Sequence, residues 1–546
     1  MSSRRDADGS SAMEWLAEYT NAAPQQAGNP PISASLVRVQ ARRATLITEH
    51  LVAGEPLVLP DPVGTGKTAV ALIAAAMLLE AKAVRRVVVV APNEVVRQQW
   101  KHRATWVRSP QTGKPPAGHP FRVLTKKQLS VERRPVKPEG VLVVIDEAHR
   151  GLQAEGDFHQ EIEAWAKGCH VLLVTATPFQ LSSQGLLTML AVGRTGDDRG
   201  KTAVETYGAA VAGLARQYRA AVKRSAPAPT RDPVVLAALQ SAIQRRPAAV
   251  EVLNRRILPP DKGLLRLRGE PATLRRDTVK VSDDWQEAYH VARVVPELVD
   301  TGKGDMFNRR LLSCSEAFWH GTAGHALQEK AKAKESPRVA TLAQQLERRL
   351  GHGRGHPKIN ATADWVAQRL REGRHVLVFC VFLDTQQVLA KAVASKLGKR
   401  GAESVKAPTG AALPSTVVDR FRNPQGPSLA LVVTDRFSES IDLDGGRPCL
   451  VHHDLPWTPA RVTQRWGRVV RAGSQFTPVK QQDIYVPVLD VDADRRLFDT
   501  VKTRAALGDL LLPRDVLTDT QDTDEYTLPE KLLDQLRPKS RQRHPG

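Results

Sequence analysis

A glycine-rich segment, DPVGTGKT at residues 61–68, separates the apolar run PLVLP from a long apolar stretch typical of a helix. A strand, a glycine loop and a helix in this order form a common binding site for nucleotide phosphates. The glycines let backbone N–H groups turn toward phosphate oxygens, and the helix N-terminus adds partial positive charge. We expect Lys67 to bind the β- and γ-phosphates of ATP and Thr68 to bind Mg²⁺. The predicted phosphate-binding residues are Gly64, Thr65, Gly66, Lys67 and Thr68.

An acidic pair, Asp146 and Glu147, follows the apolar run VLVVI. A carboxylate at the end of a strand can hold Mg²⁺, which we expect of Asp146, and its neighbour Glu147 can orient and deprotonate the attacking water. Without a phosphate loop such a pair is more commonly a solvated helix cap. Together with the loop it predicts a site for the hydrolysis of Mg-ATP, and we expect His149 to couple the nucleotide to the next motif.

Short apolar runs rich in β-branched residues predict buried strands of parallel sheets, and each run ends in small or polar residues. They fall into two groups on either side of residues 181–355, where helical spacing dominates and pairs of arginines recur. Because the site of a parallel sheet lies at the carboxyl ends of its strands, each group predicts an α/β domain with functional residues at one edge. The runs are VVVVAP (87–92), VLVVID (141–146), VLLVTATP (171–178), HVLVFCVF (375–382), LALVVTD (429–435) and CLVHHDLP (449–456).

Shifts in composition predict five segments along the chain. Residues 1–34 are predicted to be a flexible leader, and 35–180 an ATP-binding α/β lobe. Residues 181–355 are predicted to form a basic, mainly helical insert or connector, and 356–490 a second α/β lobe. Residues 491–546 are predicted to hold a short helical extension and a basic tail.

The chain carries 79 Lys and Arg against 58 Asp and Glu, a net charge of +21. Most of the excess lies in residues 101–140, with ten basic against two acidic residues, and in residues 181–355, with 29 against 18. Such an excess favours a polyanion as partner and predicts phosphate contacts that weaken with salt. Two other interpretations stay open: arginine-rich codon usage, and solvated helix faces. No motif for reading bases appears, so we expect no strong base specificity.

Cysteine usage and hydropathy predict a cytoplasmic protein. The four cysteines lie far apart and form no CxxC pair, which argues against a zinc site and against a disulfide framework. The segment MSSRRDADGSS has no apolar core of a signal peptide, and no run of 18 apolar residues occurs. We therefore expect a protein with no membrane segment.

The segments DPVGTGKT, DEAH (146–149) and TATP (175–178) resemble, in this order, motifs I, II and III of superfamily 2 helicases. TDRFSESIDL (434–443) resembles motif V of that family, and QRWGRVVR (464–471) resembles motif VI. This resemblance covers about 35–180 and 356–490 and implies two RecA-like lobes in tandem, with the ATP site between them. Asp61 and the step DLPW before motif VI are similar to the Swi/Snf-type translocase branch and its bacterial relatives, whereas Pro62 departs from the pattern DExGxGKT.

The resemblance also implies roles for single residues. Gln40 resembles the glutamine that reads adenine, with a solvated helix residue as the alternative. Arg468 and Arg471 resemble the arginine fingers that stabilise charge on the γ-phosphate in the transition state, and Gln464 is expected to position water or that phosphate. The residues expected to couple the ATP state to nucleic acid are His149, Thr175, Thr177, Glu439 and Asp442.

The family also places a nucleic-acid strand across both lobes. Pro92, Arg97 and Thr125 of the first lobe and Thr434 of the second are at positions comparable to its contact motifs, and each has a structural alternative. Phe382 is a further comparable position that is more typical of a core residue.

These observations predict an ATP-dependent helicase or translocase with Mg²⁺ as cofactor and nucleic acid, DNA more than RNA, as partner. Roles in DNA repair, transcription recycling or phage defence are typical of bacterial relatives. No nuclease, methyltransferase or zinc module is visible in the sequence, so any nuclease or targeting activity would come from a partner protein. The alternatives are a non-enzymatic scaffold that binds nucleic acid and responds to ATP, and an RNA helicase.

Overall fold

The apolar runs of the first α/β region form a five-stranded sheet in which every strand pair is parallel. The strand order is β1-β5-β4-β2-β3, so the phosphate loop leaves the edge strand β1, and the acidic pair leaves the central strand β4. The strands are β1 (Leu57–Leu59), β2 (Arg86–Ala91), β3 (Phe121–Thr125), β4 (Val141–Asp146) and β5 (His170–Val174).

This computed structural model divides into two compact units. The first comprises Met1–Pro271, Thr458–Lys480 and Thr503–Gly546, and the second Ala272–Trp457 and Gln481–Lys502. The residues that the structure describes are 10–23, 33–54, 56–61, 64–116, 120–152, 157–176, 189, 192, 198–223, 232–259, 261, 276–299, 304–333, 336–351, 355–398, 401–409, 413–423, 425–435, 443, 448–469 and 483–511.

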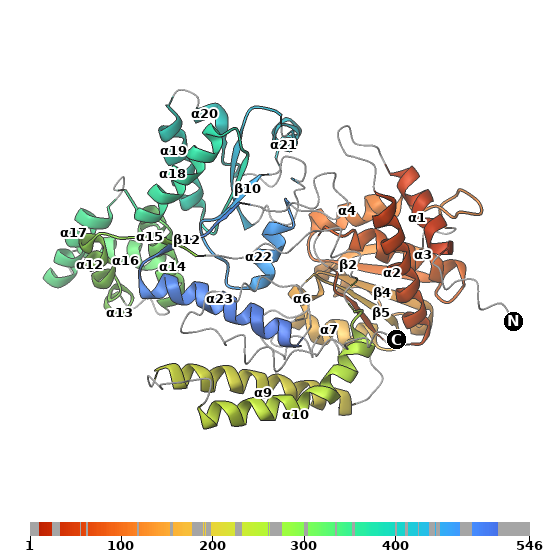
Figure 1. Ribbon diagram of the computed structural model, residues 1–546. Helices are drawn as coiled ribbons and strands as arrows, with labels where there is room; N and C mark the ends of the chain where they lie inside the picture. Colours follow the sequence, from red (N-terminus) through yellow and green to blue (C-terminus); the bar gives the residue numbers. More distant parts are fainter. Residues whose placement is uncertain are drawn as a thin grey trace, which may run out of the picture. The chain divides into compact units, whose positions relative to one another are not determined.

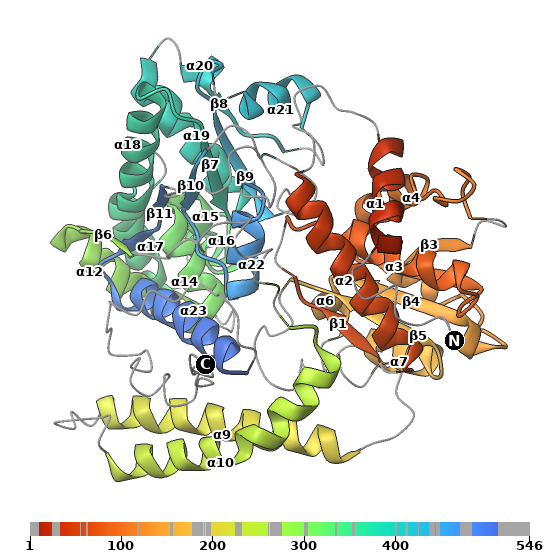
Figure 2. The same ribbon diagram turned by 45° about the vertical axis from the view of Figure 1, so that its right-hand side comes forward.

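Alternate residues of the first sheet face two separate apolar cores. In β2, Val87 and Val89 belong to a core shared with α1 (Ser10–Ala22), α2 and α3, whereas Val88 and Val90 belong to a core shared with α7, α9 (Asp198–Lys223) and α10 (Pro233–Arg256). Both faces of the sheet are therefore covered, as the continuous apolar runs predict, and Figure 2 shows α2 and α3 in front of the strands. The helix that directly precedes the first strand is α2 (Ala34–Val52), and the helices between the strands are α3 (Lys67–Glu80), α4 (Glu94–Ala104), α5 (Lys126–Leu129), η2 (Pro138–Gly140), α6 (Ala148–Gly151) and α7 (Asp157–Ala166).

Residues 10–22 differ from the flexible leader expected for 1–34. They form a helix, α1 (Ser10–Ala22), that packs against α2 and α3. Trp15 and Leu16 are buried in the core on that face of the sheet, and the Trp15 indole N–H donates to Glu80 at 3.3 Å. The apolar face of MEWLAEYT thus provides the burial that an isolated leader would lack.

The expected insert 181–355 is divided between the two units at Pro271. Its first part forms α9 (Asp198–Lys223) and α10 (Pro233–Arg256), which pack side by side (Figure 1) and share a core with the first sheet. Ile257, directly after α10, forms a parallel bridge with Val58 of β1, which ties the helix pair to the sheet.

The second unit contains another five-stranded parallel sheet, in the order β11-β10-β7-β9-β8. Two parallel sheets with helical segments between them confirm the predicted fold class. The strands are β7 (Val376–Cys380), β8 (Val405–Lys406), β9 (Ala430–Thr434), β10 (Cys449–His452) and β11 (Ile484–Tyr485), and their helices are α18 (Pro357–Arg371), α19 (Leu383–Leu397), α20 (Gly401–Ser404) and α21 (Ser415–Arg422). The helix α22 (Pro459–Trp466), which follows β10 in the chain, belongs to the first unit.

A helical cluster completes the second unit around a core of its own, which includes Trp285, Tyr289 and Trp319. It also contains a short parallel pair of strands, although the sequence of 181–355 shows no strand-like run. The elements are β6 (Asp277–Val279), α12 (Asp283–Ala292), α13 (Val295–Leu298), α14 (Gly304–Ser313), α15 (Ser315–Trp319), α16 (Thr322–Lys332), α17 (Pro337–Leu350), β12 (Pro487–Leu489) and α23 (Asp492–Leu511), of which the part up to Lys502 belongs to this unit.

Within the described part of the chain, every helix is too short or too polar to cross a bilayer.

The packing of α1 predicts a large stability cost for its truncation. Trp15→Ala should lower the free energy of unfolding of the first unit by about 3–5 kcal/mol, because it removes a buried aromatic side chain. Denaturant titration of the full chain measures the change. Glu14→Ala on the exposed face of the same helix should change it by less than about 0.5 kcal/mol, and equal effects of the two variants would contradict the packing role.

Candidate nucleotide site

The phosphate loop has the backbone geometry that its glycines predict. Gly64 and Gly66 have φ of 82° and 83°, in the left-handed region that side chains disfavour. Gly66 is the N-cap of α3, so Lys67 and Thr68 occupy the first turn, whose N–H groups have no carbonyl acceptor within the helix. Pro62 and Val63 lie outside the described residues. The backbone at the start of α3 is thus suited to bind an anion.

Gln40 lies against this loop. Its side-chain Nε2 donates to the Thr65 carbonyl at 3.0 Å, and both residues are buried. A Cβ atom on Gly66 would lie 2.2 Å from that nitrogen, so a larger residue there would displace the Gln40 amide and break its hydrogen bond to the loop. Gln40 therefore supports the loop, and its contact with adenine stays a prediction.

Asp61, which stands where a plain phosphate loop begins with glycine, forms a buried ion pair. Arg43 Nε donates to its Oδ2 at 3.0 Å, and Arg43 Nη2 donates to its Oδ1. The third guanidinium nitrogen donates to the Pro259 carbonyl at 2.8 Å. The side chains are 1% and 2% exposed, so this bidentate pair fixes the start of the loop on α2. The sequence reasoning missed Arg43, although it follows Gln40 by three residues and so lies on the same side of the helix.

The two carboxylates of the predicted hydrolytic pair lie at the end of β4. Asp146 Oδ2 accepts a hydrogen bond from the Trp100 indole N–H at 2.7 Å, and Oδ1 accepts from the Glu147 backbone N–H at 2.9 Å. Burial, with the Glu147 charge as the second cause, raises the pKa of Asp146 to about 6, although the Trp100 hydrogen bond and Lys67 act in the opposite direction. Glu147 has φ of 47°, a left-handed conformation that few non-glycine residues adopt.

A buried network joins Glu147 to the next motifs. His149 Nδ1 lies 2.7 Å from Thr175 Oγ1, and Gln464 Nε2 lies 3.4 Å from His149 Nε2 and 3.5 Å from Glu147 Oε2. An amide nitrogen can only donate, so His149 Nε2 accepts, and the ring proton is on Nδ1, directed to Thr175. The structure thus brings together four predicted residues, all from the first unit. Arg468, one turn after Gln464, is half-buried. Thr177, Arg471, Glu439 and Asp442 lie outside the described residues.

The residues at this edge of the sheet fit Mg²⁺. Asp146 and Thr68 offer hard oxygen ligands, and the carboxylate has a raised pKa, which a nearby cation would reverse. Mg²⁺ is commonly held by one or two protein ligands together with nucleotide phosphates. Among the described residues, no group of three or more His, Cys, Asp or Glu side chains could hold a metal ion.

Three of the four predicted nucleic-acid contacts lie at the ends of strands, and the fourth, Arg97, lies on a helix. Pro92 follows β2, and Arg97, on α4, makes a bidentate pair with Glu94 at 2.7 and 2.5 Å. Thr125 caps α5 by accepting from the Gln128 N–H at 3.3 Å, and in the second unit Thr434 is buried at the end of β9. These contacts explain local roles, and binding of nucleic acid by these residues stays a prediction.

Comparison with known proteins assigns both α/β regions. Residues 35–180 match the family described as type III restriction enzyme, res subunit, and residues 358–473 match the helicase conserved C-terminal domain. None of the curated proteins compared matches the chain. The chain is also similar to the Hef helicase domain of Pyrococcus furiosus (14% identity, TM-score 0.43, covering 84% of this chain and 96% of that one). It is similar to the SWI2/SNF2 ATPase core of Sulfolobus solfataricus in complex with dsDNA (14% identity, TM-score 0.32, covering 83% and 87%).

The buried pair of Arg43 and Asp61 predicts strong coupling between the two positions. Asp61→Ala should destabilise the first unit by about 3–5 kcal/mol, because it leaves the guanidinium buried without its counter-charge. The double variant Arg43→Met with Asp61→Leu should recover most of that loss, since it buries no charge. Thermal and denaturant unfolding measure both, and a double variant as unstable as Asp61→Ala would show that the pair does not act as described.

Proposed function

We propose that this chain, an ATP-hydrolysing helicase of superfamily 2 that acts on nucleic acid, is a DNA translocase of the Swi/Snf-type branch. The observation that supports its chemistry best is the convergence of Glu147, His149, Thr175 and Gln464 beside the phosphate loop. Hydrolysis at this site powers movement along the phosphate backbone, and separation of strands is not required. The two lobes of the motor correspond to residues 35–180 and 356–490.

The hydrolytic step follows from the placement of these residues. Lys67 and the N–H groups of the first turn of α3 bind the phosphates. Asp146 and Thr68 would hold Mg²⁺, which would neutralise charge on the phosphates when bound. Glu147 accepts a proton from the attacking water, and the Gln464 amide holds its carboxylate through the 3.5 Å contact.

The same hydrogen-bond network can transmit the change in nucleotide charge that hydrolysis produces. Gln464 touches both Glu147 and His149, and His149 donates to Thr175, whose backbone N–H donates to the Leu59 carbonyl of β1 at 3.1 Å. A change in the charge of the nucleotide therefore acts on side chains from several motifs at once. Arg468 and Arg471 resemble arginine fingers. We therefore assign to them the stabilisation of charge on the γ-phosphate in the transition state.

DNA is favoured over RNA by the residues that precede motif VI. The step DLPW at 454–457 and Asp61 in the loop are similar to the Swi/Snf-type branch. The net charge of +21 suits sequence-independent contact with a phosphate backbone. We assign the chain to DNA repair, transcription recycling or phage defence, because bacterial relatives of this branch act there. Any targeting or nuclease activity would come from a partner protein.

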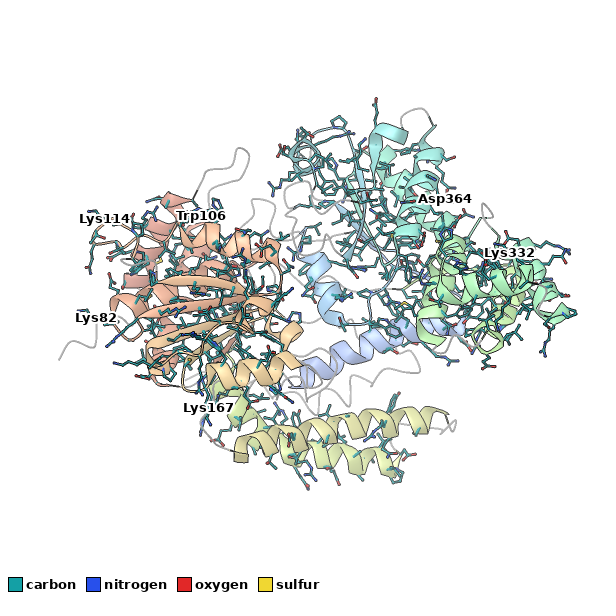
Figure 3. All side chains as sticks on the ribbon, turned by 180° about the vertical axis from the view of Figure 1, so that it is seen from behind. Lys82, Trp106, Lys114, Lys167, Lys332 and Asp364 are labelled. Carbon is teal, nitrogen blue, oxygen red and sulfur yellow. The ribbon has the colours of Figure 1, made fainter. Side chains whose placement is uncertain are left out.

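Substitutions in the loop and in the acidic pair test the chemistry. Lys67→Ala should weaken ATP binding and abolish turnover, and Glu147→Gln should retain ATP binding but lower turnover by roughly 10²–10⁴. Phosphate-release assays with and without DNA measure turnover. Lys167→Ala, at an exposed position after α7 (Figure 3), serves as the control and should be unaffected. Full activity of Glu147→Gln would exclude Glu147 as the base.

The choice of track is tested by comparing activators of ATP turnover. Duplex DNA, single-stranded DNA and RNA of equal length should be titrated against the wild-type protein. We expect DNA to stimulate more strongly than RNA, and the activation constant to rise steeply with salt because counterions are released on binding. Stimulation by RNA alone would replace the proposal with an RNA helicase.

A further inference from the structure

We propose that Trp100 is a positioning residue for hydrolysis, which holds the carboxylate of Asp146 in place and connects it to helix α4. The inference rests on the proposed role of Asp146 as a ligand of Mg²⁺. It gives a function to a buried tryptophan outside the predicted catalytic set.

The geometry of the contact is that of a specific support. The Trp100 side chain is 1% exposed, and its indole N–H, which can only donate, points to Asp146 Oδ2 at 2.7 Å. The other oxygen, Oδ1, accepts from the Glu147 backbone N–H at 2.9 Å. Each carboxylate oxygen therefore has one fixed donor, which sets the orientation of the group and leaves further lone pairs for a ligand.

The Trp100 side chain is itself fixed by packing in the core of the first unit. Val96 and Trp100 of α4 are both buried in the core that also contains Val87 and Val89 of β2. The helix begins at Asn93, whose side chain accepts from the Val96 N–H at 2.9 Å. The indole is thus positioned by the packing of α4 on the sheet, not by contacts with solvent.

The same helix carries a predicted contact with nucleic acid. Arg97 precedes Trp100 by three residues and lies on an adjacent part of the helix surface. Pro92, at the end of β2, precedes the helix cap. A small shift of α4 on binding a phosphate backbone would move the indole donor and hence the Asp146 carboxylate. Trp100 therefore provides a direct physical link between the two sites.

A conservative substitution separates this role from simple packing. Trp100→Phe keeps an aromatic ring in the core but removes the N–H donor. The matched control is Trp165→Phe, since Trp165 is also buried in the first unit and donates to a backbone carbonyl, that of Glu132, at 3.2 Å. Thermal unfolding of both variants measures the cost of the lost ring volume.

The informative measurement is the Mg²⁺ dependence of nucleotide binding. A fluorescent ATP analogue is titrated with each protein in EDTA and at increasing Mg²⁺. In EDTA, we expect Trp100→Phe to bind the analogue as the wild type does. It should need about 10–100-fold more Mg²⁺ to reach half of the Mg²⁺-dependent gain in affinity for the analogue, because the loss of a residue that supports a metal ligand typically weakens metal binding by this factor. DNA stimulation of turnover should fall as well. Trp165→Phe should match the wild type in both.

The outcomes distinguish this inference from the proposed function. If the wild type shows no Mg²⁺-dependent gain, the assignment of Asp146 as a metal ligand fails. If the wild type shows it and Trp100→Phe needs no more Mg²⁺ than Trp165→Phe, the positioning role is overturned and the site assignment stands.

A measurement on the wild-type ring covers the case in which Trp100→Phe does not fold. In protein labelled with ¹⁵N-tryptophan, addition of Mg²⁺ to the nucleotide complex should shift one indole N–H resonance, and Asp146→Asn should shift the same resonance. If no indole resonance responds to both changes, the proposal is contradicted.

Discussion

The parallel arrangement of the first sheet is the constraint on which the site depends. Parallel strands end at the same edge, so the loop after β1, the acidic pair after β4 and Thr175 after β5 are brought together although they are far apart in sequence. The strand order places β5 between β1 and β4, and the hydrogen bond from the Thr175 N–H to the Leu59 carbonyl extends the pairing of β1 and β5 to this edge. The helices on both faces bury the sheet and make the edge the available place for polar chemistry.

Buried polar groups then define the details of that edge. Arg43 and Asp61 satisfy each other beside the loop, and His149 forms hydrogen bonds through both ring nitrogens. Such groups are costly to bury unless they are paired, so the side chains must keep the positions in which their hydrogen bonds form. The first unit therefore has a site whose geometry is set before any ligand binds, which is the condition for electrostatic stabilisation of a transition state.

The sequence predicted most of this framework, because its signals are local. Apolar runs gave the strands, and the glycine loop gave the start of α3, where φ of Gly66 confirms the expected turn. The contacts of Arg43 and Trp100 were not predictable, since each joins residues far apart in the chain through the packing of a helix on the sheet. The same reason explains α1 and the division of 181–355: periodicity shows that a helix forms, but not which core receives its apolar face.

The left-handed backbone of Glu147 has a consequence for how this protein could evolve. A side chain in that conformation costs roughly 1 kcal/mol or more relative to glycine, so the fold carries a small strain at the residue that would activate water. Selection for a more durable fold alone would favour glycine at this position. With Glu147 as the proposed base, selection for turnover would keep the carboxylate, and a lineage that abandoned catalysis would have a ready route to greater stability through this single codon.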